Sequence, residues 1–331
     1  MKNISIIVPE TGIIEAIADP RYLFTAANEF LKSAGKKPLF KVELVGHKKS
    51  IKLLNNLVTI HPSKTLDEVK KTDLIFIPAI SGNIDEAIKS NKAYIKWMIE
   101  QYKKGAELAS LCIGAFLLAE TGLLDGKQCS THWLSASDFR ERYPKVNLID
   151  GSIISDAGGI YSSGGANSYW TLLLYLLEKY TDRETAILAS KFFAVDIDRN
   201  SQAKFMMFVG QRKHTDSSIH ESQNYIEKNV EEKMTLDYLA KKVNLGRRTF
   251  ERRFKDATGN SVLEYIQRIK IEHAKRNLET SMKNVNEIMY DCGYTDTKAF
   301  RDLFKKITGL TPIEYRNKYN KMNLHLTEEL V

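Results

Sequence analysis

The sequence predicts two domains of different fold class: an α/β domain built on a layered parallel sheet, and then an all-α domain that contains one helical motif twice. Three observations lead to this prediction. Short β-branched runs alternate with helical patterns over residues 1–200. A segment that begins at Phe250 recurs fifty residues later, at Phe300. The chain of 331 residues is also long enough for two domains of ordinary size.

Each strand of the first domain is predicted from a short apolar run of the kind that is buried in a parallel sheet. The first four runs are Ile4–Val8, Lys41–Val45, Leu74–Pro78 and Leu108–Leu111, and later runs at Val146–Ile149, Ser152–Ser155 and Ile160–Ser162 predict additional strands. Helical patterns lie at Tyr22–Ala34, Glu86–Lys103 and Asn167–Lys179. Strands and helices in alternation favour a layered sheet with right-handed crossovers.

The boundary between the domains is expected in a polar segment, residues 210–222, which contains Gly and Ser. The predicted organisation is a first domain over residues 1–209, this linker, and a second domain over residues 223–325. Residues 1–200 hold 25 Lys and Arg against 23 Asp and Glu, whereas residues 201–331 hold 24 against 18. The basic excess suits a phosphate-binding surface, although charge that only keeps the protein in solution is the alternative.

The repeated segment has the pattern of a helix-turn-helix. Both copies contain F-x-x-x-F-K-x-x-T-G, followed by a hydroxyl residue and then by Glu-Tyr. A short amphipathic helix is predicted before each copy, at Leu236–Val243 and at Val285–Cys292. A short helix, a tight turn and a second helix form the geometry that places a helix in the major groove of DNA. The duplication therefore predicts a DNA-binding domain with two reading helices.

A candidate reactive site lies in the first domain, where the run that ends at Leu111 meets a sharp turn at Cys112. A nucleophile at a strand-to-helix turn is lifted out of the sheet, and the start of a helix lowers the pKa of a thiol. His132, Trp133 and Glu15 can reach the same edge of the sheet. Cys, His and Glu are the parts of a thiol hydrolase or of a reactive-cysteine sensor. The alternatives are a cysteine kept for packing and a histidine that forms a local hydrogen bond.

Composition excludes several other classes of protein. Cys112, Cys129 and Cys292 have unrelated spacings, so neither a disulfide framework nor a zinc site is expected, and no metal or cofactor is predicted. The apolar run at Ile4–Val8 is too short for a signal peptide, and no stretch approaches the roughly 20 residues of a membrane span. A cytoplasmic protein without a membrane partner is therefore expected.

Several segments resemble a known family. Residues 110–127 and Thr131-His132-Trp133 resemble the segment of GlxA-type transcriptional regulators that carries their elbow cysteine, and Asp156–Gly159, Tyr161–Gly165 and Arg199–Gln202 resemble the motifs that follow it. Residues 217–325 resemble an AraC/XylS-type DNA-binding domain, with Gly293-Tyr294, Phe304-Lys305, Gly309–Pro312 and Tyr315-Arg316 in signature positions. The resemblance implies a PfpI-like (class I glutamine amidotransferase-like) domain with a flavodoxin-like sheet, fused to a double helix-turn-helix domain.

The residue after the elbow cysteine departs from the family pattern. PfpI-type proteases often carry His there and GlxA-type regulators often carry Thr, whereas this chain has Ile113, which cannot act as a base. This departure weakens the hydrolase interpretation and favours a small-molecule pocket. The predicted pocket residues are Glu15, Cys112, Ile113, His132, Trp133 and Ser162. For Ser162, an ordinary helix-capping role is the alternative.

The resemblance to AraC-type readers also suggests which residues face DNA. In the first reading helix, about Arg247 to Asp256, it places Arg248, Thr249, Glu251 and Arg252 toward the groove. In the second, which is predicted to start near Asp296, helical periodicity exposes Thr297, Lys298, Arg301 and Asp302. Lys305, Lys306 and Arg316 are expected to contact phosphate or nothing. A long helix around Val262–Leu278 would place the two reading helices in successive major grooves, about 34 Å apart.

These observations predict a transcription regulator rather than an enzyme. Its expected partners are promoter DNA, a small-molecule effector, a second copy of the chain in a homodimer, and RNA polymerase. The alternative is a thiol amidohydrolase or glyoxalase-like enzyme that acts through Cys112. A scaffold protein without an effector is a third class, but a complete α/β domain with an elbow is more than a scaffold needs.

Overall fold

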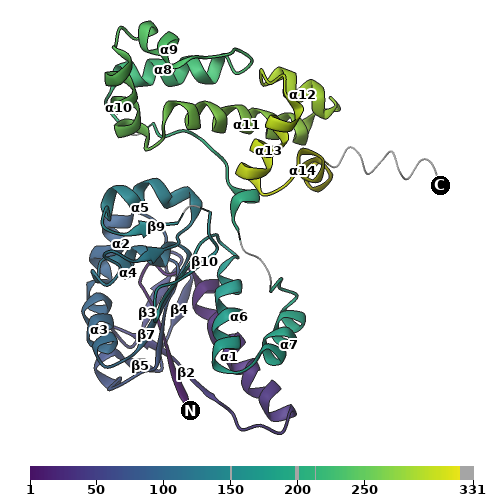
Figure 1. The fold of residues 1–331 in the computed structure, drawn as a ribbon. Coiled ribbons are helices and arrows are strands. Elements are labelled where there is room, and N and C mark those ends of the chain that lie inside the picture. Colours follow the sequence, from purple (N-terminus) through teal and green to yellow (C-terminus); the bar gives the residue numbers. More distant parts are fainter. Residues whose placement is uncertain (150, 198–200, 213, 321–331) are drawn as a thin grey trace, which may run out of the picture. The chain divides into compact units, whose positions relative to one another are not determined.

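The computed structural model describes residues 1–149, 151–197, 201–212 and 214–320 (Figure 1). The chain divides into two compact units, Met1–Gln202 and Ala203–Val331. The first unit has an α/β fold and the described part of the second is all α-helical, apart from one short 3₁₀ turn. The two fold classes agree with the sequence prediction. Among the described residues, no helix combines the length and the apolar character that a membrane crossing requires.

The first unit is built on a seven-stranded sheet with the order β10-β11-β7-β6-β1-β2-β5. Its strands are β1 (Lys2–Ile7), β2 (Phe40–Gly46), β5 (Lys64–Thr65), β6 (Leu74–Ile77), β7 (Glu107–Leu111), β10 (Ile154–Asp156) and β11 (Ile160–Ser163). All neighbours are parallel except β10, which runs antiparallel to β11. Two short pairs lie outside this sheet, β3 (Ile51–Leu53) with β4 (Val58–Ile60) and β8 (Gln128–Cys129) with β9 (Asn147–Leu148).

Helices cover both faces of the sheet (Figure 1). One hydrophobic core contains α1 (Ile14–Ser33), α6 (Tyr169–Tyr180) and α7 (Arg183–Phe193); the other contains α2 (Ile84–Ser90), α3 (Lys92–Lys103), α4 (Ala115–Ala119) and α5 (Ala136–Arg142). Strand β6 shows why its sequence is a continuous apolar run. Leu74 and Phe76 enter the first core, and Ile75 and Ile77 enter the second. Burial on both faces leaves no position for a polar residue.

Two helices differ from their predicted bounds for physical reasons. Helix α1 begins at Ile14 rather than Tyr22 and continues through Pro20, which is buried together with Ala16 and Ile17 of the same helix. The predicted helix at residues 86–103 is divided at Asn91. The Asn91 side chain accepts a hydrogen bond from the backbone N–H of Glu10 and donates to the carbonyl of Ala87, so it ends α2 in a contact with a distant loop.

The second unit contains seven helices among its described residues. They are α8 (Ser217–Lys228), α9 (Leu236–Lys242), α10 (Arg247–Thr258), α11 (Val262–Thr280), α12 (Val285–Asp291), α13 (Thr297–Thr308) and α14 (Pro312–Tyr319). Helix α11 runs between the α8–α10 group and the α12–α14 group (Figure 1). It supplies Tyr265 and Ile266 to one hydrophobic core and Ile271 and Leu278 to the other. We call α9–α10 together with the turn that precedes α9 the first motif, and α12–α13 together with the turn between them the second motif.

The structure explains the residues of the repeat one by one. Phe250, Phe254, Phe300 and Phe304 are fully buried and form the centre of each core. The threonine hydroxyl that follows donates to the carbonyl of the second phenylalanine, and the glycine ends the helix in the left-handed conformation, with φ of 67° in the first copy and 75° in the second. The hydroxyl residue and the glutamate then form a capping box at the start of α11 and of α14.

The segment predicted as a linker belongs largely to the second unit. We call residues 203–212 the entry segment. The Phe208 ring packs on Tyr265, with 5.2 Å between ring centroids. The Gln211 carbonyl accepts from Gln223, and Arg212 donates to Glu227 at 2.6 Å. Helix α8 also begins inside the predicted linker. Polar residues near 210 therefore form hydrogen bonds to α8 and do not make up an exposed connecting loop.

Replacing Phe300 by Ala is expected to lower the free energy of unfolding of the second unit by about 3–5 kcal/mol, because the change removes a buried ring and leaves a cavity. Phe250→Ala should have an effect of the same size in the first motif. The measurement is urea unfolding of the full chain, followed by the helical circular dichroism signal.

Two controls are available within the chain. All three tryptophans of the chain, Trp97, Trp133 and Trp170, lie in the first unit. Tryptophan fluorescence therefore follows the unfolding of that unit, and its urea midpoint should remain that of the wild type. Leu263 is 64% exposed on α11, and Leu263→Ala should change stability by less than about 0.5 kcal/mol. A wild-type helical transition in both phenylalanine variants would contradict the assignment of these rings to the cores.

Candidate functional sites

The turn after β7 holds Cys112 in a backbone conformation that L-residues rarely adopt. Cys112 has φ of 55°, and a non-glycine residue in this region costs on the order of 1–3 kcal/mol. Close packing of the next residues maintains the turn. A Cβ atom on Gly114 would lie 2.4 Å from the carbonyl oxygen of Ile77, so only glycine fits there. Ile113 packs against both cores of the sheet. The predicted elbow is therefore present.

The Cys112 thiol is buried and protonated. Cys112 is only 4% exposed, and this burial raises the pKa of the thiol to about 11. A hydrogen bond from the backbone N–H of Ile113 lowers the pKa, but by less than burial raises it. A lowered pKa was expected from the position of Cys112 at the start of a helix, and this expectation is wrong. Helix α4 has five residues, and its N-terminus does not compensate for the loss of water around the sulfur. The thiolate is therefore a minor species at pH 7.

His132 and Trp133 lie near the elbow but do not activate it. The Nδ1 atom of His132 accepts a hydrogen bond of 3.2 Å from the backbone N–H of Leu134, and burial lowers the pKa of the imidazole. His132 is therefore neutral at pH 7. The rings of His132 and Trp133 lie 5.6 Å apart and are half-buried. Among the described residues, no hydrogen bond joins His132 to Cys112. The structure thus contains the local histidine bond that was the alternative to catalysis.

Glu15 occupies an exposed position in the first turn of α1. Tyr169, which was not predicted as a site residue, lies close enough to both Glu15 and Cys112 to feel their charges. Burial and the hydrogen bond from its hydroxyl to Asp19, at 2.7 Å, raise the pKa of Tyr169, and the nearby Glu15 and Cys112 contribute in the same direction. Glu15 and Asp19 are four residues apart and share one side of α1. The sequence feature that could have identified Tyr169 is its position at the start of α6.

Adjacent serines of β11 have different roles. Ser162 lies in a buried hydroxyl network, where it accepts from the backbone N–H of Ser130 at 2.6 Å and shares a hydrogen bond with Ser155. Ser163 instead lies by the elbow and accepts from the backbone N–H of Cys112 at 3.5 Å. Side chains alternate between the faces of a strand, so only one of the two serines can face Cys112. The structure places Ser163 there rather than the predicted Ser162.

Gln202 closes the elbow region. Its amide nitrogen donates to the carbonyls of Thr131 and Ser152, and the Thr131 hydroxyl donates to the carbonyl of Cys112 at 3.2 Å. A Cβ atom on Gly164 would lie 2.4 Å from the backbone carbonyl oxygen of Thr131, so glycine is required at this position. Gln202 belongs to the closing motif noted in the sequence, whose Arg199 and Asn200 lie outside the described residues.

The predicted DNA-facing residues of α10 share one exposed side of that helix. Those residues are Arg248, Thr249, Glu251 and Arg252, and all are exposed. Arg253 differs, because its guanidinium donates two hydrogen bonds to Asp216, at 2.7 and 2.8 Å, and so fastens α10 to the start of α8. Among the residues that the structure describes, the ion-pair contacts of Glu251 and Arg252 are distant ones within the helix, at 4.0 and 3.9 Å.

Helix α13 presents a similar surface. The carboxylate of Asp296 accepts from the backbone N–H groups of Lys298 and Ala299, so Asp296 caps the helix that was predicted to start near this residue. Lys298, Arg301 and Asp302 are exposed and Thr297 is half-buried. The flanking lysines Lys305 and Lys306 are also exposed. Arg316 is not available for phosphate in the same way, because its guanidinium donates to the backbone carbonyl of Lys283.

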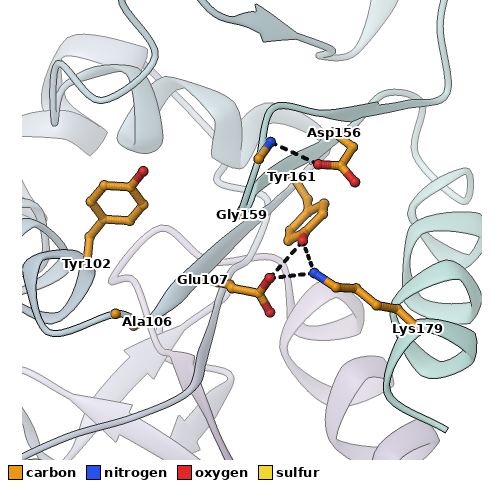
Figure 2. Close-up of a pocket in the computed structure, with 9 residues that line it drawn as sticks. Tyr102, Ala106, Glu107, Asp156, Gly159, Tyr161 and Lys179 are labelled. Carbon is orange, nitrogen blue, oxygen red and sulfur yellow. Dashed lines mark hydrogen bonds and ion pairs between the residues drawn. The ribbon is translucent and has the colours of Figure 1, made fainter.

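A depression of about 650 Å³ lies at the other edge of the sheet, where β7 begins at Glu107 (Figure 2). Figure 2 shows Glu107, Tyr161 and Lys179 pointing toward one another. Burial alone would raise the pKa of Glu107, but hydrogen bonds from Lys179 at 2.5 Å, Tyr180 and Tyr161 lower it. The charges of this cluster compensate one another. The elbow follows the opposite end of β7, so the depression is separate from the predicted ligand pocket.

Comparison with known protein families identifies both units. Residues 22–179 match the family model described as the DJ-1/PfpI family, and residues 239–318 match the model described as a helix-turn-helix domain. The first match falls within the sheet unit and the second covers most of α9–α14.

Similar proteins are named as helix-turn-helix transcriptional regulators. The HTH-type transcriptional regulator GbdR of Pseudomonas aeruginosa is 27% identical over 263 residues, which are 78% of this chain and 69% of the relative. The HTH-type transcriptional regulator GlxA of Rhizobium meliloti is 24% identical over 215 residues, 65% of this chain and 66% of the relative. The fold of the first unit resembles a crystal structure of a THiJ/PfpI family protein from Pseudomonas syringae, with a TM-score of 0.50, 16% identity, and coverage of 60% of this chain and 76% of that one.

At pH 7, iodoacetamide is expected to modify Cys112 of the folded protein at least about a hundredfold more slowly than in urea-unfolded protein, because the thiolate is the nucleophile and burial disfavours it. The rate should increase as the pH rises toward the pKa of about 11. Peptide mass spectrometry measures the modification, with the buried Cys129 and Cys292 as internal references. Rapid modification at pH 7 would reveal an accessible thiolate and contradict this description of the site.

Proposed function

We propose that this chain, which joins a DJ-1/PfpI domain to an AraC-type helix-turn-helix domain, is a transcription regulator that binds promoter DNA and responds to a small metabolite. The observation that carries the proposal is the pair of exposed, arginine-containing helices α10 and α13 on two buried cores. The regulator acts in the cytoplasm as a homodimer and communicates with RNA polymerase.

DNA reading is assigned to the exposed sides of α10 and α13. Arg248 and Arg252 on α10 and Arg301 on α13 can each bind the O6 and N7 atoms of guanine, and Glu251 can accept from cytosine N4. Lys305 and Lys306 lie in the last turns of α13, where a flexible ammonium group suits a phosphate. Arg316 is left out of the DNA-contacting set because it is engaged with Lys283.

Effector binding is assigned to the region around Thr131, next to the elbow. Ser130 Oγ and Gln202 Oε1 are buried and have no hydrogen-bond partner in the described part of the chain. A buried polar atom without a partner costs about 1–3 kcal/mol, so each atom gains from a ligand that supplies one. The half-buried faces of His132 and Trp133 add apolar contact. A small molecule with both a polar group and an apolar part suits these side chains.

The same region also has a direct covalent route to the DNA-binding unit. Gln202 hydrogen-bonds to Thr131 and is followed at once by Ala203, the first residue of the entry segment. Gln202 is the last residue of the first unit. A ligand that competes for its amide would therefore weaken the hydrogen bonds that hold the chain immediately before the second unit. This connection supports regulation rather than a separate enzymatic activity.

The enzyme alternative has less support. Catalysis by Cys112 requires a thiolate and a nearby base. The thiol has a raised pKa, Ile113 carries no base, and the Nδ1 atom of His132 is used by Leu134. The strained conformation of Cys112 is the one observation that favours an enzyme, since nucleophiles often occupy such turns. We propose that the strain shapes the effector site.

Arg248→Ala and Arg301→Ala should each weaken binding to the preferred DNA sequence by about 1–3 kcal/mol and relax the preference at one base pair. Lys305→Ala should lower affinity on all sequences and reduce the slope of log affinity against log salt by about one. The duplexes come from in vitro selection with the wild-type protein, and fluorescence anisotropy at matched salt gives the affinities. Arg316→Ala is the comparison for an arginine that is engaged within the protein. Wild-type affinity of both groove variants would refute the assignment of the reading helices.

Cys112→Ser should retain DNA binding and much of the effector response, because a binding site needs shape and polarity rather than a sulfur nucleophile. His132→Ala and Trp133→Ala should lose the response more severely. A reporter gene under the selected operator, in cells given a panel of metabolites, measures the response. Leu134 is 64% exposed beside these residues, and Leu134→Ala is the matched control.

A hydrolysis assay on purified protein separates the enzyme alternative. Amide and ester substrates are expected to show no turnover that depends on Cys112. Robust turnover that Cys112→Ser abolishes would overturn the sensor assignment in favour of a thiol hydrolase.

A further inference from the structure

We propose that the buried ammonium group of Lys270 fixes the spacing of α10 and α13 within one chain. Lys270 thereby determines which separation of DNA half-sites the protein binds, where a half-site is the stretch of DNA that one motif contacts. Lys270 is a positioning residue in this proposal, because it acts through the two motifs and does not touch DNA. The inference rests on the proposed DNA-binding function, since it requires both reading helices to contact one duplex.

Lys270 lies near the middle of α11 and is 7% exposed. Its Nζ atom donates to three backbone carbonyls, those of Val230 at 2.6 Å, Glu232 at 3.0 Å and Cys292 at 2.7 Å. An ammonium group has three N–H donors, so all of them are used. Val230 and Glu232 belong to the turn before α9, and Cys292 ends α12. A single side chain thus joins the first motif to the second.

The backbones of the two motifs also touch at this point. Gly293 has φ of 70°, and a Cβ atom there would lie 2.2 Å from the carbonyl oxygen of Glu231 and 2.9 Å from Lys270 Nζ. The Cys292 thiol donates to the Lys270 carbonyl at 3.4 Å. The Tyr294 ring lies 5.6 Å from the ammonium group. Any movement of one turn past the other would therefore break several contacts at once.

The position of this contact relates it directly to α13. Cys292 is separated by three residues from Asp296, which caps the start of α13. On the other side, the turn at Val230–Glu232 leads into α9, which packs against α10 in the first core. The two hydrophobic cores are separate clusters along α11. Contacts that fix both turns to one atom consequently fix the orientation of the two reading helices.

The chemistry of the contact favours a role in geometry over a role in stability. An ammonium group loses its hydration on burial, and apolar side chains of similar size often stabilise a core as well as a buried ion does. No carboxylate lies within ion-pair distance of Lys270 among the described residues. What a lysine supplies and a methionine does not is three directional hydrogen bonds to two different motifs.

The test compares full-length wild type with Lys270→Met on duplexes obtained by in vitro selection with the wild type. One set of duplexes keeps the two half-sites at the selected spacing, a second inserts or removes one or two base pairs between them, and a third contains a single half-site. Wild type should prefer the selected spacing by about a hundredfold, because avidity is lost when geometry prevents simultaneous binding. Lys270→Met should keep single half-site affinity while this preference falls below about tenfold.

Lys275→Met is the matched control. Lys275 is a second buried lysine of α11, but its Nζ atom donates to the Met206 carbonyl and to Glu272, and to neither turn. Its spacing preference should remain that of the wild type. An equal loss of preference in Lys275→Met would show that general loosening of α11 is responsible and would overturn the proposal.

A wild-type spacing preference in Lys270→Met would also overturn it. Where Lys270→Met loses single half-site binding, Lys270→Gln carries the same comparison, because glutamine retains a donor at this point. Loss of half-site binding in both variants would assign Lys270 to the folding of the motifs and reject the spacing role. Failure of the wild type to select any sequence would instead refute the DNA-binding function, before the variants are compared.

Discussion

The second unit depends on one constraint: helix α11 must complete two hydrophobic cores at the same time. Tyr265 and Ile266 close the first core, and Ile271 and Leu278 close the second. The polar side chains of α11 between these positions are covered by the motifs and lose contact with water. They therefore need hydrogen-bond partners within the protein. Lys270 and Lys275 resolve this conflict by donating to backbone carbonyls of the segments around them. Of the two, only Lys270 reaches the turns that lead to the reading helices, so their arrangement follows from its contacts.

Burial has the opposite consequence in the first unit. A sheet covered on both faces provides a rigid support for the elbow, but the same cover removes water from the Cys112 sulfur and raises its pKa. The fold therefore supplies the position of a nucleophile without its ionisation. Ser130 and Gln202 retain polar atoms without partners in the described residues, so the region suits binding more than bond cleavage.

Local patterns predicted much of the fold, whereas the errors arose where a distant contact decides the outcome. The strands β1, β2, β6 and β7 and the starts of α10 and α13 are properties of short segments, and these were predicted close to their observed places. The break at Asn91 and the raised pKa of Cys112 each depend on residues remote in sequence. Ser162 and Ser163 could have been separated by strand alternation, but only with the register of β11 against β7. The roles of the candidate site residues remain predictions.

The entry segment has a consequence for how such a protein could be recombined. Phe208, Gln211 and Arg212 are bonded to helices of the DNA-binding unit, although they precede its first helix. A crossover at the polar stretch near residue 210 would separate Phe208 from Tyr265 and leave the recipient reader with an incomplete core. A crossover between Gln202 and Ala203 transfers a whole hydrogen-bonded module. In a chimera, the fusion point that preserves the second unit therefore lies directly after Gln202, the last residue of the first unit, and not in the polar segment 210–222.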